Sequence, residues 1–265
     1  MSGPELAAYL AAGLLSGLLA GLFGVGGGVI LVPALIWVFA HNGIATDWIP
    51  HLAVGTSLAT ILGTGAASAR AHHRRGAVRW DLFRRLAPWI VLGAWLGSAL
   101  AGLLPEVWLK RIFALFLLYV GGRMLWRTES RSPQRALPGG IGMGLAGAGI
   151  GTLSALVGIG GGTLTVPFLT RSGLDMRRAV ATSSACGVPI AVAGSIGFMV
   201  TGWGREGLPA WSTGFVYWPA VAAVLLASVP TAPVGARLAH SLPLPVLRRV
   251  FGVLLLAVAL RLLWS

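Results

Sequence analysis

Apolar runs of about twenty residues recur along almost the whole chain, and each is long enough to cross the roughly 30 Å hydrocarbon core of a bilayer. Hydrophobic residues make up 56% of the 265 positions and charged residues only 10%. So few charged side chains cannot cover the surface of a water-soluble protein of this length. The pattern therefore predicts an all-α polytopic membrane protein.

The positive charge of the chain has a membrane explanation. The net charge of +13 comes from arginines, with a single lysine, that lie almost entirely between the apolar runs. Basic residues flanking spans mark the cytoplasmic side, so we expect no nucleic-acid partner. The first apolar run lacks a basic leader and is interpreted as a membrane segment. The single cysteine, Cys186, excludes an intrachain disulfide and is expected to be a small packing residue.

The two halves of the chain carry the same landmarks in the same order. GVGGGVILVP at 24–33 matches GIGGGTLTVP at 158–167, and VGTS at 54–57 matches VATS at 180–183. We interpret this as a duplication within one membrane domain. Its parts are a first repeat at 1–127, a cytoplasmic linker at 128–136 and a second repeat at 137–265.

Each repeat is expected to contain five helical segments. They are 5–23, 28–40, 50–70, 84–103 and 107–126 in the first repeat, and 137–157, 162–170, 177–201, 213–237 and 244–264 in the second. The segments 28–40 and 162–170 are too short to cross a bilayer alone. We therefore expect eight full spans, and each short segment forms half of a glycine-tipped broken or re-entrant helix pair.

The placement of the basic residues favours inverted repeats over parallel ones. If each glycine turn reverses the chain, the repeats are inverted and sixteen of the twenty basic residues lie on the cytoplasmic side. If each turn only kinks a span, the repeats are parallel and twelve do. The inverted arrangement places both termini on the non-cytoplasmic side of the inner membrane. Inverted repeats are a recurrent plan of secondary transporters, with the substrate bound between the halves.

The expected spans lack the groups that catalysis or metal binding would need. No aspartate or glutamate falls inside one, which argues against a carboxylate proton relay or a cation site. The five histidines are expected at the membrane interfaces, in contact with solvent. We therefore expect no enzyme activity, no catalytic residue, no metal site and no cofactor.

The two glycine turns are the strongest candidates for a binding site. Glycines leave backbone N–H groups accessible, and a helix N-terminus carries about half a positive charge, so together they can hold an anion. Hydroxyls of the following helices could donate hydrogen bonds to the same anion, or could cap their own helices. The prolines after the turns, Pro33 and Pro167, are candidate gating residues that limit or kink the short helices. The candidate substrate-binding residues are Gly26, Gly27, Gly28, Thr56, Ser57, Gly160, Gly161, Gly162, Thr182 and Ser183.

The paired motifs, GVGGGVILVP with AVGTSL and GIGGGTLTVP with AVATSS, resemble the sulfite exporter TauE/SafE family of membrane permeases over nearly the whole chain. The resemblance implies transport of a sulfur-containing anion, such as sulfite or an organosulfonate, with the glycine and TS positions as the site. A related thiosulfate-transporting group uses several cysteines, whereas this chain has one.

We therefore expect a secondary transporter that works by alternating access. Its partners are a small anion and the lipid bilayer, and homo-oligomerisation is left open. The alternative is a non-transporting membrane subunit that anchors or assists a redox or assembly partner.

Overall fold

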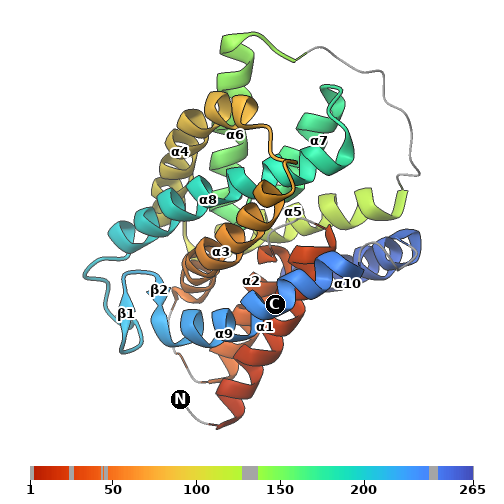
Figure 1. Cartoon of the computed structure of the whole chain (residues 1–265). Coiled ribbons are helices and arrows are strands. Elements are labelled where there is room, and N and C mark those ends of the chain that lie inside the picture. Colours follow the sequence, from red (N-terminus) through yellow and green to blue (C-terminus); the bar gives the residue numbers. More distant parts are fainter. Residues whose placement is uncertain are drawn as a thin grey trace.

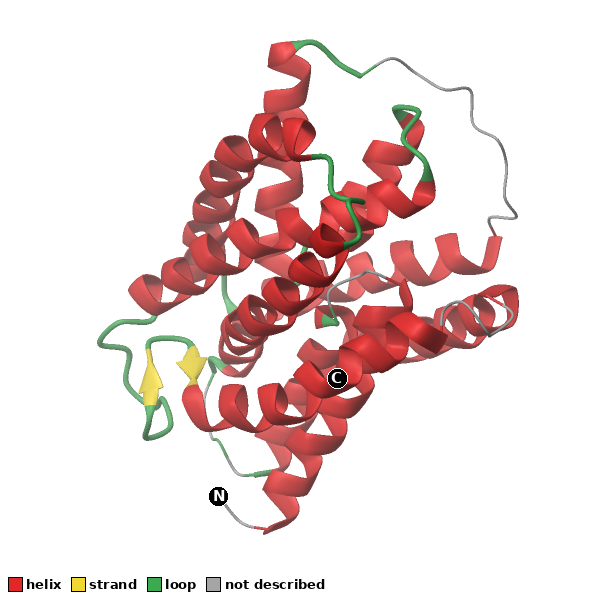
Figure 2. Cartoon of the chain, viewed as in Figure 1, coloured by secondary structure: helices red, strands yellow, loops and turns green. Residues whose placement is uncertain are grey.

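The computed structural model of the chain describes residues 3–23, 27–42, 44, 47–126, 137–238 and 244–264. These residues form ten α-helices and one short β-hairpin (Figures 1 and 2). The helices are α1 (Gly3–Phe23), α2 (Gly28–His41), α3 (Ile49–Arg74), α4 (Trp80–Leu103), α5 (Glu106–Trp126), α6 (Gly140–Val157), α7 (Gly162–Arg171), α8 (Met176–Thr201), α9 (Trp218–Leu238) and α10 (Leu244–Trp264). The antiparallel hairpin pairs β1 (Ser212–Thr213) with β2 (Val216–Tyr217).

The predicted all-α architecture is confirmed, with one correction at the start of α9. A helix was expected over 213–237, but α9 begins at Trp218. The residues before it form the β-hairpin, whose turn contains Gly214 at a φ of 53°. Because this left-handed conformation favours glycine and interrupts a helix, the chain turns here before α9 starts.

The multi-pass prediction is also confirmed. Among the described residues, six helices are long and apolar enough to cross a bilayer, namely α1, α3, α4, α6, α8 and α9. Eight such spans were expected, but α5 and α10 do not belong to the six. α5 carries Glu106, Lys110 and Arg111 near its start, which lowers its mean hydropathy. α2 and α7 have 14 and 10 residues and are too short to span.

The most buried of the six candidate spans, α3 and α8, run antiparallel through the centre of the molecule (Figure 1). Near the start of α3, Gly55 faces Phe198 of α8. Near its end, Ser68 donates a hydrogen bond to Ser184 over 3.3 Å. α5 and α10 also cross antiparallel, with Gly121 against Leu256 and Gly252 against Leu125.

Two further helix pairs flank this centre, and both are parallel. α1 packs on α9, where Gly13 and then Gly17 approach Val224 and then Ser228. α4 packs on α6, where Gly93 and then Gly97 approach Ala148 and then Thr152. Each of these glycines lies against backbone of the neighbouring helix, which is how small residues bring membrane helices together.

Candidate functional site

Both glycine turns end in the same backbone conformation. Gly27 precedes α2 with a φ of 71°, and Gly161 precedes α7 with a φ of 74°. This left-handed region favours glycine. Gly162, the first residue of α7, and Gly160 are also described, whereas Gly26 lies outside the described residues. The turns therefore place two helix N-termini, with their free N–H groups, inside the protein.

The two turns lie directly against each other. A β-carbon on Gly28 would collide with the carbonyl oxygen of Gly158 and would lie 3.0 Å from Cα of Ile159. On the other side of the second turn, a β-carbon on Gly187 of α8 would lie 2.7 Å from the carbonyl oxygen of Gly160. Only glycine fits at such backbone contacts. The structure thus brings together two motifs that are more than a hundred residues apart.

Of the four predicted hydroxyl groups, three are bonded to backbone, and only Ser57 is bonded to a glycine turn. Ser57 Oγ donates to the carbonyl of Gly158 over 2.8 Å. Thr56 Oγ1 accepts the N–H of Tyr217, and Thr182 Oγ1 accepts the N–H of Arg79, each over 3.0 Å.

Ser183 is the fourth of these residues. Its Oγ is buried and has no partner within the described part of the chain. Thr56, Ser57 and Thr182 therefore brace the fold in this conformation, whereas the hydroxyl of Ser183 makes no such bond.

The two prolines do not end their helices. α2 continues from Pro33 to His41, and α7 continues from Pro167 to Arg171. Both prolines therefore lie inside their helices and do not limit them, and a kink at either proline stays a prediction. Because a proline has no N–H, it leaves the carbonyl four residues earlier without its helical bond, and that carbonyl lies in the first turn next to the glycines.

A small cavity adjoins the second glycine turn, between α3 and α8. It holds about 20 Å³, roughly the space of one water molecule, and is too small for a sulfur oxyanion. Its lining is Ala20, Ile61, Thr64, Gly65, Ser68, Gly160, Ser184 and Gly187. Thr64 and Ser68 were not predicted from the sequence, although their spacing of four residues on α3 would place both on one helix face.

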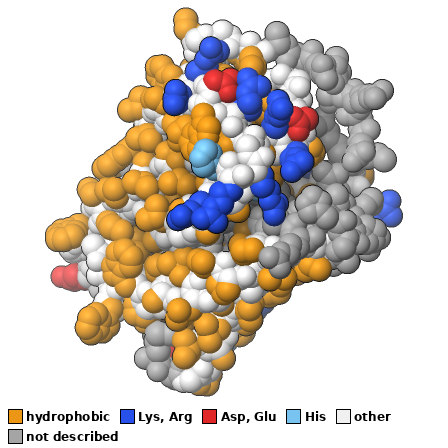
Figure 3. Space-filling view, viewed as in Figure 1, with side chains coloured by type: hydrophobic (Ala, Val, Ile, Leu, Met, Phe, Trp, Pro, Cys, Tyr) orange, Lys and Arg blue, Asp and Glu red, His pale blue; other side chains and the backbone are white. Residues whose placement is uncertain are grey.

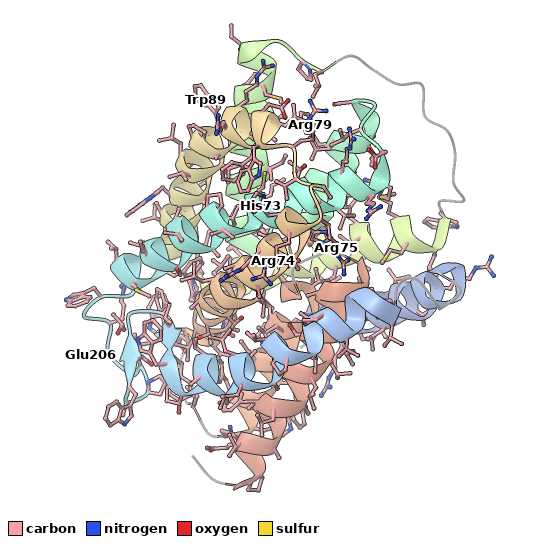
Figure 4. The ribbon with its side chains drawn as sticks, in the orientation of Figure 1. His73, Arg74, Arg75, Arg79, Trp89 and Glu206 are labelled. Atoms are coloured by element: carbon pink, nitrogen blue, oxygen red, sulfur yellow. The ribbon has the colours of Figure 1, made fainter. Side chains whose placement is uncertain are left out.

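The α3–α8 pair has two contrasting ends. We call one the basic end, which carries Arg70, Arg74, Arg75, Arg177 and Arg178, and the other the aromatic end, which carries Trp48, His51, Phe198 and Phe215. Arginines gather on one face of the molecule and apolar side chains cover its flanks (Figure 3). Figure 4 places Arg74, Arg75 and Arg79 away from Glu206, which lies beside the β-hairpin.

The interior of the described protein contains no buried aspartate or glutamate, in line with the sequence analysis. It also contains no group of three side chains that could hold a metal ion. Cys186 is fully buried, as expected for a packing residue.

One histidine contradicts the expectation of interfacial, solvated side chains. His51 is fully buried because it lies in the first turn of α3, where that helix meets the end of α4. Its Nε2 lies 2.9 Å from the carbonyl oxygen of Ala101 and 3.1 Å from that of Leu104. Its ring packs against Trp48 and Phe215.

Comparisons with known proteins agree with this architecture. A probable membrane transporter protein of Haemophilus influenzae is 35% identical over 246 residues, which cover 90% of each chain. A probable membrane transporter protein of Xylella fastidiosa is 30% identical over 92% of this chain and 89% of its own. YunE, a probable membrane transporter protein of Bacillus subtilis, is 27% identical over 68% of this chain and 73% of its own.

No solved structure matches the chain. The family model described as sulfite exporter TauE/SafE matches residues 9–262, which is almost the full length. The chain therefore belongs to the TauE/SafE sulfite exporter family of membrane transporters.

Proposed function

We propose that this protein is a secondary transporter that moves a small sulfur-containing anion, sulfite or an organosulfonate, across the inner membrane by alternating access. The observation that carries the proposal is the contact between the two glycine turns, Gly28 against Gly158, beside the α3–α8 pair. The N-terminus of α2 lies there against Gly158, the C-cap of α6, and α7 begins four residues later at Gly162, in a protein interior without buried carboxylates among the described residues. The two helix N-termini favour an anion.

Inverted repeats are part of the proposal, and the helix directions support them. Inversion of 137–265 relative to 1–127 requires corresponding helices to run in opposite directions across the membrane. α3 and α8 correspond to each other in the sequence repeat and pack antiparallel, as do α5 and α10. In a parallel duplication both pairs would run the same way. With the arginine-rich linker 128–136 in the cytoplasm, both termini lie outside.

The lengths and contacts of the short helices support re-entrant helix pairs as part of the proposal. α2, with 14 residues, is about 21 Å long, and α7, with 10 residues, is about 15 Å long. Both are shorter than the hydrocarbon core. α2 also folds back along α1, since the rings of Tyr9 and Phe39 are in contact and Gly27 lies beside Ser16. We therefore place each glycine turn inside the membrane, at the tip of a re-entrant pair.

The substrate is held in this proposal by N–H groups of the turns and by the neighbouring hydroxyls. The site comprises Gly26, Gly27, Gly28, Thr56, Ser57, Gly160, Gly161, Gly162, Thr182 and Ser183. Pro33 and Pro167 are the gating residues, because the carbonyls that they free allow the first turns of α2 and α7 to deform. The cavity of about 20 Å³ supports an occluded conformation, in which the site must open to admit the anion.

Anion flux into proteoliposomes tests the proposal. We expect saturable uptake of sulfite or of methanesulfonate by the purified protein. Gly161→Ala should reduce this flux at least tenfold, because a β-carbon there would strain the backbone and collide with Ile190. The matched control is Gly149→Ala, a helical glycine with open space around its β-carbon position.

Three outcomes separate the possibilities. Absence of flux in the wild-type protein would overturn transport. Retained flux in Gly161→Ala would overturn the site at the turns. Equal flux with and without a pH gradient would rule out proton coupling. A subunit that only anchors a partner would carry no anion, and its anchoring role would survive the Gly161→Ala substitution.

A further inference from the structure

Hydroxyl groups around the second glycine turn are buried without hydrogen-bond partners. Ser154 near the end of α6 and Thr165 in α7 are both fully buried, and neither side-chain oxygen has a partner within the described part of the chain. The Oγ1 of Thr163, which lies between them in sequence, is also unpartnered. Native proteins pair nearly all of their buried polar groups, so this cluster requires an explanation.

Ser154 and Thr165 flank the residue that caps α7. A β-carbon on Gly161 would lie 3.4 Å from Thr165 Oγ1 and 3.7 Å from Ser154 Oγ. The N–H groups of Leu164 and Thr165 already bond to the carbonyl of Gly161, over 3.1 and 2.7 Å. The N–H groups of Gly162 and Thr163 come before the first N–H groups that bond within α7, so they have no partner within that helix. Two hydroxyls therefore lie beside the N-terminus of α7, and the side chain of Ile190 fills the space between them in this conformation.

Several hydroxyls in the described helices bond to their own helix, unlike those of this cluster. Thr170, on the same helix α7, donates to the carbonyl of Val166 over 3.0 Å. Ser195 of α8 donates to the carbonyl of Ala191 over 2.6 Å. This back-bonding is the ordinary arrangement of serine and threonine within a helix. Ser154 and Thr165 do not use it, so their protons are available to a ligand.

The first glycine turn does not have these hydroxyls. In the sequence repeat, Ala20, Val29 and Leu31 stand where Ser154, Thr163 and Thr165 stand in the second half. The first turn has a hydroxyl from a different position instead, since Ser16 of α1 lies beside Gly27. Hydroxyls at 154, 163 and 165 are therefore specific to the second turn.

We propose that the oxyanion group of the substrate binds at the second glycine turn, where Ser154 and Thr165 donate hydrogen bonds to it beside the N-terminus of α7. This inference rests on the proposed transport function and gives the two turns different roles. The second turn holds the oxyanion, and the first closes against it through Gly28.

The chemistry of this subsite also selects the charge of the substrate. A helix N-terminus supplies about half a positive charge, and hydroxyls supply none. None of the lining groups is an arginine or lysine, so a buried dianion would keep most of its desolvation penalty. The subsite therefore favours a monoanion, such as a sulfonate or hydrogensulfite, over a dianion such as sulfate.

The test compares hydroxyl variants in proteoliposomes, with methanesulfonate and sulfite as the transported anions. Ser154→Ala and Thr165→Val should each raise the half-saturation concentration about tenfold. Thr170→Val and Ser195→Ala, whose hydroxyls are bonded to their own helices, are the matched controls and should leave it unchanged. Sulfate should compete at least tenfold more weakly than methanesulfonate.

Thermal unfolding of the purified protein adds a readout that does not depend on flux. Because the two hydroxyls lack partners in the empty protein, their removal should leave its unfolding temperature unchanged within a degree or two. The stabilisation by added methanesulfonate should be lost in both variants and kept in both controls.

The outcomes distinguish failure of the oxyanion subsite from failure of the transport function. Wild-type flux with unaltered half-saturation and unaltered ligand stabilisation in both variants would overturn the subsite and leave transport standing. Equal competition by sulfate would overturn the selection for monoanions. A wild-type protein that carries no sulfur anion would overturn transport and the subsite together.

Discussion

The aromatic end and the basic end of the α3–α8 pair have the same pattern of hydrogen bonds. The two ends differ in the size of the side chains that pack there. At the aromatic end, the N–H of Phe215 donates to the carbonyl of Phe198 over 3.1 Å. Two residues later, the N–H of Tyr217 donates to Thr56 Oγ1 over 3.0 Å. The loop that covers this end is thereby fixed to both central helices.

The basic end repeats this arrangement with different residues. The N–H of Ala77 donates to the carbonyl of His72 over 3.2 Å. Two residues later, the N–H of Arg79 donates to Thr182 Oγ1 over 3.0 Å. Each threonine thus binds a residue of the other half of the chain. Thr56 binds Tyr217, which immediately precedes α9, and Thr182 binds Arg79, which immediately precedes α4.

The side chains at matching positions differ in size. Phe215 is fully buried among Trp48, His51 and Phe198, so it fills the aromatic end. Ala77, its counterpart, lies in a small apolar cluster with Val78, Ala181 and Ala185. The cavity lies between the second glycine turn and the basic end, where Ser68 meets Ser184. Under the proposed alternating access, this conformation is sealed at the aromatic end.

The largest expected effect on stability comes from removing the buried Phe215 ring at the aromatic end. Phe215→Ala should lower the free energy of unfolding by about 3–5 kcal/mol, because it removes a buried ring and leaves a cavity. It should also expose the helix ends beneath the β-hairpin. Thermal unfolding measures the loss of stability. Thiol labelling of Met199→Cys, in a Cys186→Ala background, measures the exposure of the helix ends.

Phe113→Ala is the control for this variant, since Phe113 is equally buried in α5. It should destabilise the protein to a similar extent without increasing labelling at position 199. If both variants increase labelling equally, the aromatic end does not act as a local seal.

A smaller effect is expected at the buried histidine. His51→Phe keeps an aromatic ring but removes the donor that reaches the carbonyls of Ala101 and Leu104, so the free energy of unfolding should fall by about 1–3 kcal/mol. Denaturant unfolding in detergent measures this change. His41→Phe, at an exposed position, should have little effect. A neutral His51→Phe would mean that stacking alone holds the aromatic end.

The smallest expected effect tests whether the threonine hydrogen bonds at the two ends contribute equally to stability. Thr56→Val and Thr182→Val each remove the acceptor of one backbone N–H, and each should cost about 1 kcal/mol of unfolding free energy. The two losses should agree within about 0.5 kcal/mol. Parallel unfolding curves test this, with Thr201→Val as a control, whose hydroxyl bonds to its own helix. Clearly unequal losses would contradict a shared backbone plan.

Much of the helix pattern was predictable because hydropathy and glycines are local signals. The short helices expected at 28–40 and 162–170 appear as Gly28–His41 and Gly162–Arg171. The glycine turns bound them sharply, since Gly27 and Gly161 take a conformation that side chains disfavour. The β-hairpin before α9 was missed because its strands have two residues each, too few for an alternating pattern.

The candidate site was only partly predictable. Glycines and TS pairs stand out in a repeat, so the turns and Ser57 were predicted as site residues, and this stays a prediction. Ser154 and Thr165 were missed because isolated hydroxyls in apolar helices usually back-bond to their own helix. Their significance depends on the absence of a partner, which only the positions of neighbouring atoms reveal.

The sequence by itself determined that this protein is a multi-pass helical membrane protein of the TauE/SafE family, because apolar length and recurring motifs are properties of the chain. The tertiary structure decided which helices pair and in which direction, that Gly28 meets Gly158, and that His51 is buried. These are contacts between residues far apart in the chain, and they arise from packing of whole helices, so no local pattern encodes them.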